Sequence, residues 1–133
     1  MNMKKFIICV FAVFVTVLVT DFVIHQVLLK GMYAETASLW RPDTEIAGKM
    51  GYMFAGQFLV ALFFAWIFIH GYKGTGIMEG VRFGLLMGGF ELGHNMIMYA
   101  VAPYPCSVVC GWALAGFGQG VLVGVVASLT YKK

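Results

Sequence analysis

Residues 77–100 read IMEGVRFGLLMGGFELGHNMIMYA, and this stretch decides the fold that the sequence predicts. At 1.5 Å per residue the segment is long enough to cross a hydrocarbon core of about 30 Å. It nevertheless carries Glu91, His94 and Asn95 close together. Charged and polar groups inside a bilayer are costly and usually face a packed neighbour. The segment is therefore predicted to be a membrane helix that lies against other helices.

Three further apolar runs accompany it, at residues 6–29, 50–69 and 107–129. The chain has 133 residues, of which 61% are hydrophobic and only 11% are charged. Soluble domains are about 45–50% apolar and about 25% charged, so the solvent of this chain is expected to be lipid. The first run is longer than the apolar core of a signal peptide and is expected to be retained. The sequence thus predicts one all-α domain over residues 1–133, an up-down bundle of four transmembrane helices.

Lysine and arginine are distributed unevenly between the two predicted sides of the membrane. Six of them lie at the termini or near the loop after the second run, and three lie in the loop at 30–49. The positive-inside rule then places both termini in the cytoplasm, and the chain in the inner membrane of a bacterium. The net charge of +3 does not favour nucleic acid. The expected partners are the lipid bilayer and either further copies of the chain or a larger membrane complex.

Glycines recur at every fourth position in the third and fourth runs. Small residues at this spacing let membrane helices approach closely, which replaces the hydrophobic drive that lipid cannot supply. The spacing predicts close packing between these two helices, or between copies of the chain. The glycines concerned are Gly80, Gly84, Gly88, Gly116, Gly120 and Gly124.

Polar residues of three helices are predicted to meet in one layer. On a helical wheel, the polar trio of 77–100 continues the face of its first glycine stripe. Counted along the helices, Asp21 lies about 22 Å and Glu91 about 21 Å above the inner edge, whereas Gln119 lies lower, at about 12 Å. The predicted layer, in the outer half of the bundle, comprises Asp21, His25, Gln57, Glu91, His94 and Asn95.

Four interpretations of this layer are open. The first is a hydrogen-bonded network that fixes helix packing, as in an accessory subunit, and the second is a path for protons or ions. The third is a metal site that uses the Glu-x-x-His pair, and the fourth is a haem site between His25 and His94. Passage of protons or ions is the function we expect, with the structural role as the main alternative. No cofactor is predicted.

No arrangement of residues points to catalysis. The chain has no GxSxG or HExxH motif. Its three cysteines form no CxxC pair, and a disulfide between Cys106 and Cys110, one helical turn apart, is geometrically awkward. We therefore expect a protein that is not an enzyme.

Three stretches carry a resemblance to known proteins. They are LLKGMYAETASLWRP at 28–42, GTGIMEGVRFGLLMG at 74–88 and MYAVAPYP at 98–105. Together they resemble a group of small bacterial four-helix membrane proteins of unknown function. The resemblance implies the four-helix architecture and brings no catalytic residues with it.

Overall fold

The fold of this chain is all-helical, as the sequence predicts. A computed structural model describes residues 2–132, and no strand occurs within that part of the chain. The elements in chain order are the α-helix α1 (Met3–Val23), the π-helix η1 (Ile24–Leu28), α2 (Lys30–Glu35), the 3-10 helix η2 (Ala37–Leu39), α3 (Asp43–Ala47), α4 (Met50–Gly71), α5 (Ile77–Val101) and α6 (Cys106–Thr130).

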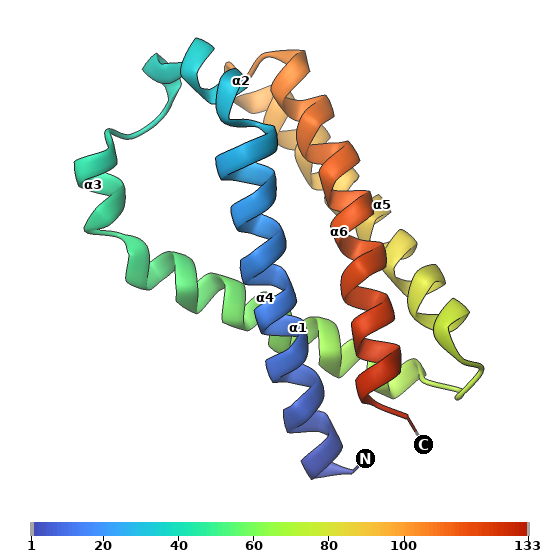
Figure 1. The fold of residues 1–133 in the computed structure, drawn as a ribbon. Helices are drawn as coiled ribbons and strands as arrows, with labels where there is room; N and C mark the ends of the chain where they lie inside the picture. Colours follow the sequence, from blue (N-terminus) through green and yellow to red (C-terminus); the bar gives the residue numbers. More distant parts are fainter. Residues whose placement is uncertain (1, 133) are drawn as a thin grey trace.

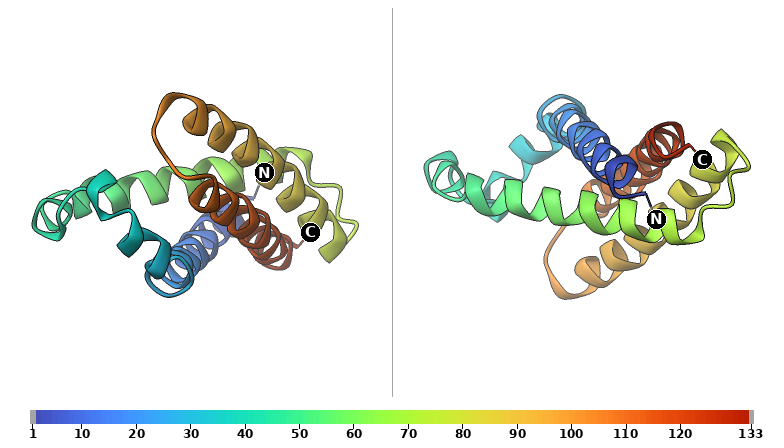
Figure 2. Two further views of the ribbon diagram at one scale, coloured as in Figure 1. Left: turned by 90° about the horizontal axis from the view of Figure 1, so that it is seen from above. Right: turned by 90° about the horizontal axis from the view of Figure 1, so that it is seen from below.

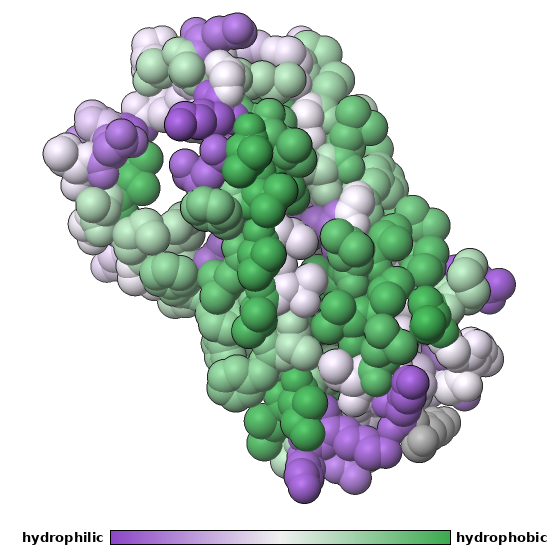
Figure 3. All heavy atoms as spheres, in the orientation of Figure 1, coloured by the Kyte–Doolittle hydropathy of each residue, from purple (hydrophilic) through white to green (hydrophobic). Residues whose placement is uncertain are grey.

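Three of the described helices are long and apolar enough to cross a membrane: α1 together with η1, α4, and α6. Only 28% of the most apolar window of each is buried inside the protein, so most of their apolar surface needs lipid as a solvent. Figure 3 shows a broad apolar surface over α1 and α6, with hydrophilic residues at both ends. α5 is 25 residues long but is not among the three, because its charged residues and glycines lower its mean hydropathy.

The glycine stripes of α5 and α6 face one another. A Cβ atom built on Gly80 would collide with the carbonyl group of Gly124, and one on Gly84 would collide with that of Gly120. Gly88 lies against Phe117 in the same way. The two backbones are thus in direct contact, and any side chain on this seam would force them apart.

α1 packs against both α4 and α6, and the half of the molecule nearer the two termini is apolar between them. In α4 the buried residues all lie in its second half, from Ala61 to Ile69. The small Ala61 and Ala65 are fully buried there, and Val13 of α1 is equally enclosed. Phe64 and Phe68 reach Phe83 of α5, with ring centroids 4.8 and 5.4 Å apart.

The arrangement differs from a regular up-down bundle in the position of α4. This helix crosses α1 obliquely, and its first turns lie well to one side of the other long helices (Figures 1 and 2). The space-filling view is open between α1 and the region where α3 and α4 meet (Figure 3). The cause is the distribution of contacts, because the second half of α4 is anchored on α1 whereas its first half has no buried residue.

Both ends of the chain lie at the same end of the molecule (Figure 1). The Asn2 backbone N–H donates to the Tyr131 hydroxyl at 3.2 Å, and the Lys5 ammonium donates to the Lys132 carbonyl at 2.6 Å. Asn2 also caps α1, because its side-chain oxygen accepts from the Lys5 N–H.

Candidate functional site

Asp21 is the centre of the polar contacts between the long helices. Gln57 Nε2 of α4 donates to one of its carboxylate oxygens at 2.6 Å, and Gln119 Nε2 of α6 donates to the other at 2.6 Å. Gln119 also donates to the Thr20 hydroxyl at 2.7 Å. A single carboxylate of α1 therefore joins three helices, α1, α4 and α6.

His25 lies one turn further along the chain, on the π-helix η1. The wider turn is marked by a hydrogen bond from the Leu29 N–H to the Ile24 carbonyl, five residues back, at 2.8 Å. Such π-turns are often found at functional sites. Nδ1 of His25 lies 2.6 Å from the Tyr33 hydroxyl, to which Trp112 Nε1 donates at 2.7 Å. Because the indole can only donate, the phenol is free to give its own proton to His25 Nδ1.

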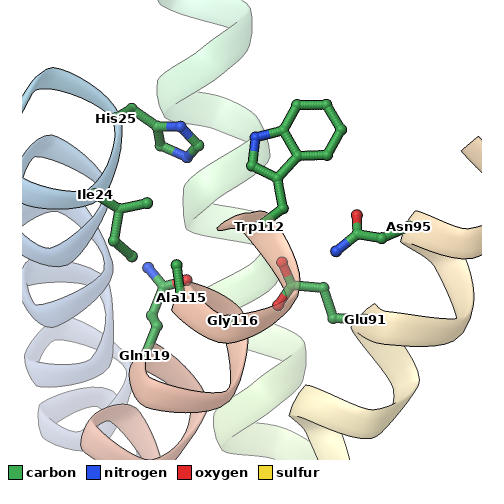
Figure 4. Close-up of a pocket in the computed structure, with 8 residues that line it drawn as sticks. All are labelled: Ile24, His25, Glu91, Asn95, Trp112, Ala115, Gly116 and Gln119. Atoms are coloured by element: carbon green, nitrogen blue, oxygen red, sulfur yellow. The ribbon is translucent and has the colours of Figure 1, made fainter. Parts of the chain in front are cut away.

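Glu91 and Asn95 of α5 line a cavity of about 150 Å³ together with His25, Trp112 and Gln119. Figure 4 shows these side chains converging from α5, α6 and η1. Asn95 is only 7% exposed, and its Nδ2 has no hydrogen-bond partner. In Figure 4 this nitrogen lies on the side that faces Glu91. A polar cavity of this size is able to hold water that bridges such groups.

A glycine of the α6 stripe makes room for the Glu91 carboxyl group. A Cβ atom built on Gly116 would lie 2.5 Å from Glu91 Oε2 and 2.8 Å from its Cδ. The stripe thus serves two purposes, since it brings the helix backbones together and leaves space for a carboxylate between them.

His94 is placed differently from the other residues of the predicted layer. It is exposed and does not line the small cavity. It borders a larger groove of about 690 Å³ that runs between α4 and the α5–α6 pair. Asp21, Gln57 and Glu91 also reach this groove, so Glu91 lies at the wall shared by the two spaces. The Gln57 Oε1 atom is buried there without a partner.

A cluster of aromatic rings lies next to the small cavity, at the end of the molecule away from the termini (Figure 1). Trp40 stacks on Tyr104 with centroids 5.4 Å apart, and both rings pack edge-on against Trp112. Tyr33 packs against Trp40 at 5.1 Å. Burial raises the pKa of the Tyr33 phenol, and the hydrogen bond from Trp112 offsets only part of this effect. Tyr33 therefore keeps its proton at neutral pH.

The described residues offer no obvious metal centre. No group of three or more histidine, cysteine, aspartate or glutamate side chains comes together in residues 2–132 in a way that could hold a metal ion. His25 and His94 do not face one another as a haem would require, because one lines the small cavity and the other the groove. The geometry therefore gives the metal and haem interpretations no support.

Three residues of the site were not singled out by the sequence. Gln119 was expected at a lower depth, but it binds Asp21, because depth counted along a helix ignores the tilt and offset between helices. Tyr33 and Trp112 were not expected to bind His25. The only available signal was that each is a polar aromatic residue near the end of an apolar run, where such residues also occur as membrane anchors.

No family model, curated protein or solved structure matches this chain. Its function is therefore argued from the site itself.

Proposed function

We propose that this chain is a non-enzymatic membrane protein with four spans, in which the buried polar layer passes protons or small ions. The observation that carries the proposal is the position of Asp21 and Glu91. Both carboxyl groups lie between apolar helices, and Glu91 lines a cavity that His25 and Gln119 share. Ionisable groups in the interior of a membrane protein commonly mark such paths.

The fourth span in this proposal is α5. Its glycines lie on α6, and Glu91 and Asn95 line a cavity that α6 also lines, so α6 covers part of the polar surface of α5. An even number of spans places both termini on the same side of the membrane, and the hydrogen bonds between the two ends of the chain agree with this. The excess of lysine and arginine at that end supports a cytoplasmic location for both termini, and an inner-membrane location in a bacterium.

In the proposed orientation the site differs on its outer and inner sides. On the outer side, Tyr33 of the aromatic cluster contacts His25, which lines the small cavity. Below Asp21 the space between α1, α4 and α6 is filled by the apolar cluster that includes Val13, Ala61 and Val123. Complete passage therefore requires the helices to move, and α4 is the best candidate because only its second half is anchored. Assembly with further copies of the chain, or with a larger complex, is part of this proposal.

Proton flux into proteoliposomes tests the proposal. Purified protein is reconstituted around a pH-sensitive dye, and a potassium diffusion potential drives proton entry. Wild-type protein should acidify the lumen faster than empty liposomes, and Glu91→Gln and Asp21→Asn should abolish the difference. Glu35→Gln and Asp43→Asn are matched controls, because both residues are exposed on the outer segments and lie away from the cavity. An absence of flux with the wild-type protein would refute the proposal.

The competing function is purely structural, and one observation favours it. Both carboxylate oxygens of Asp21 accept hydrogen bonds, so this residue is well suited to fix α1, α4 and α6 in register. In that case the wild-type protein should give no flux above that of empty liposomes, and Asp21→Asn should only loosen the assembly. Glu91 separates the two functions better, because no hydrogen bond joins its carboxyl group to another residue of the described chain.

A further inference from the structure

The groove between α4 and the α5–α6 pair has the dimensions of a ligand site. Its volume of about 690 Å³ falls within the range of about 300–1,000 Å³ that is usual for small-molecule pockets. All four long helices contribute to it, and its walls are mainly apolar. The rings of Tyr52, Phe63 and Phe90 border it and are exposed on the surface of the molecule.

The ionisable side chains that line this groove are two carboxyl groups, the imidazole of His94 and the phenol of Tyr52. Asp21 and Glu91 supply carboxyl groups, and neither lysine nor arginine lines the groove among the described residues. Gln57 adds a buried carbonyl oxygen, Oε1, that has no donor. A ligand that presents positive charge or N–H groups would pair with the Glu91 carboxyl group and with Gln57 Oε1, which have no donor among the described residues. An anionic head group would instead lie beside two carboxyl groups.

We infer that the groove binds a lipophilic organic cation, an amine or onium group carried on an apolar body, which enters from the lipid between α4 and α5. The apolar body lies against the aromatic walls, where cation–π contact adds to the attraction. The positive centre lies near Glu91 and Asp21. This inference goes beyond passage of protons or small ions, although it uses the same two carboxyl groups.

The first half of α4 explains how such a molecule would enter. It has no buried residue, and Gly56, which lines the groove, has no atom within 4 Å of the position of a Cβ. The groove is thus open along α4 rather than enclosed. A molecule already dissolved in the bilayer needs no aqueous path to reach Glu91.

Binding of tetraphenylphosphonium to the purified protein in detergent tests the inference, with tetraphenylborate as a probe of the same shape and opposite charge. Calorimetry should show saturable binding of the cation and none of the anion. Glu91→Gln should weaken cation binding at least tenfold, Glu91→Asp should restore part of it, and Glu35→Gln should leave it unchanged. Gel filtration and circular dichroism of each variant verify the fold.

Three results would overturn the inference. Equal binding of both probes would mean an apolar groove without charge selection. A phospholipid that co-purifies and is not displaced by tetraphenylphosphonium would identify the occupant as lipid. Efficient cross-linking of a Tyr52→Cys variant into dimers that no longer bind the cation would identify it as a second copy of the chain. None of these measurements needs a proton gradient, so their failure is distinct from an absence of proton flux.

Discussion

Gln119 on α6 donates its side-chain amide to Asp21 on α1 at 2.6 Å, a contact between residues 98 positions apart in the chain. The first prediction concerns this contact. Gln119→Ala leaves one carboxylate oxygen without a protein donor, and we expect it to lower the free energy of unfolding by about 1–2 kcal/mol. Unfolding by denaturant in mixed micelles measures the change. Gln26→Ala is the control, because Gln26 is exposed beside the same site on η1 and should have little effect. Equal losses for the two variants would contradict the role given to Gln119.

The seam between α5 and α6 gives a second prediction. Gly84→Ala places a methyl group against the backbone of Gly120, so the helices must separate, and we expect a loss of about 1–3 kcal/mol. Gly89→Ala on the opposite face meets no atom within 4 Å. Because alanine favours the helix over glycine by about 1 kcal/mol, Gly89→Ala should be neutral or stabilising. The same micelle unfolding experiment compares them, and a stable Gly84→Ala protein would refute the close packing.

The positions of the helices could be predicted closely from the sequence. The apolar runs at 50–69, 77–100 and 107–129 became helices at Met50–Gly71, Ile77–Val101 and Cys106–Thr130. The reason is physical, since a run of about 20 apolar residues has no other way to satisfy its backbone in lipid. Glycine spacing likewise predicted which face of α5 packs against α6, because small residues at every fourth position lie on one side of a helix.

The relative tilt of the helices could not be predicted. α4 is anchored by its second half, where Ala61 and Ala65 are fully buried, and neither residue differs in sequence pattern from other alanines of a membrane helix. The π-turn at Ile24–Leu28 also has no clear sequence signal, yet it carries His25, which binds Tyr33. Side-chain partners across helices follow from such details, which is why Gln119 and Tyr33 were missed.

Tyr33 provides a prediction about pH. Its phenol has a raised pKa in the folded protein because of burial, so its contribution to stability is complete below the ordinary tyrosine pKa of about 10. The contribution is then lost as the pH rises through the folded-state pKa. The free energy of unfolding of the wild-type protein should therefore fall more steeply above about pH 10 than that of Tyr33→Phe. Tyr99→Phe, which alters an exposed tyrosine, should keep the wild-type profile.

The same variant should be destabilised at neutral pH. Phenylalanine removes the oxygen that accepts from Trp112 Nε1 and contacts His25 Nδ1, which leaves two partly buried groups without their partner. We expect a loss of about 1–3 kcal/mol, measured at pH 7 by micelle unfolding. If Tyr33→Phe matched Tyr99→Phe at this pH, the cluster would not be held together by its hydrogen bonds.

The last prediction concerns the sides on which the two loops that flank α5 lie. Cys106 is exposed at the start of α6, Lys73 is exposed in the loop before α5, and Cys9 is fully buried in α1. If α5 spans the membrane with the termini inside, an impermeant maleimide applied to intact spheroplasts should label Cys106 of a Cys110→Ala variant but not Cys9. In a Cys106→Ala/Cys110→Ala background, Lys73→Cys should be labelled only in inverted vesicles. Labelling of both positions from the same side would show that α5 does not cross. Labelling of Cys106 only in inverted vesicles would instead reverse the orientation and keep the four spans.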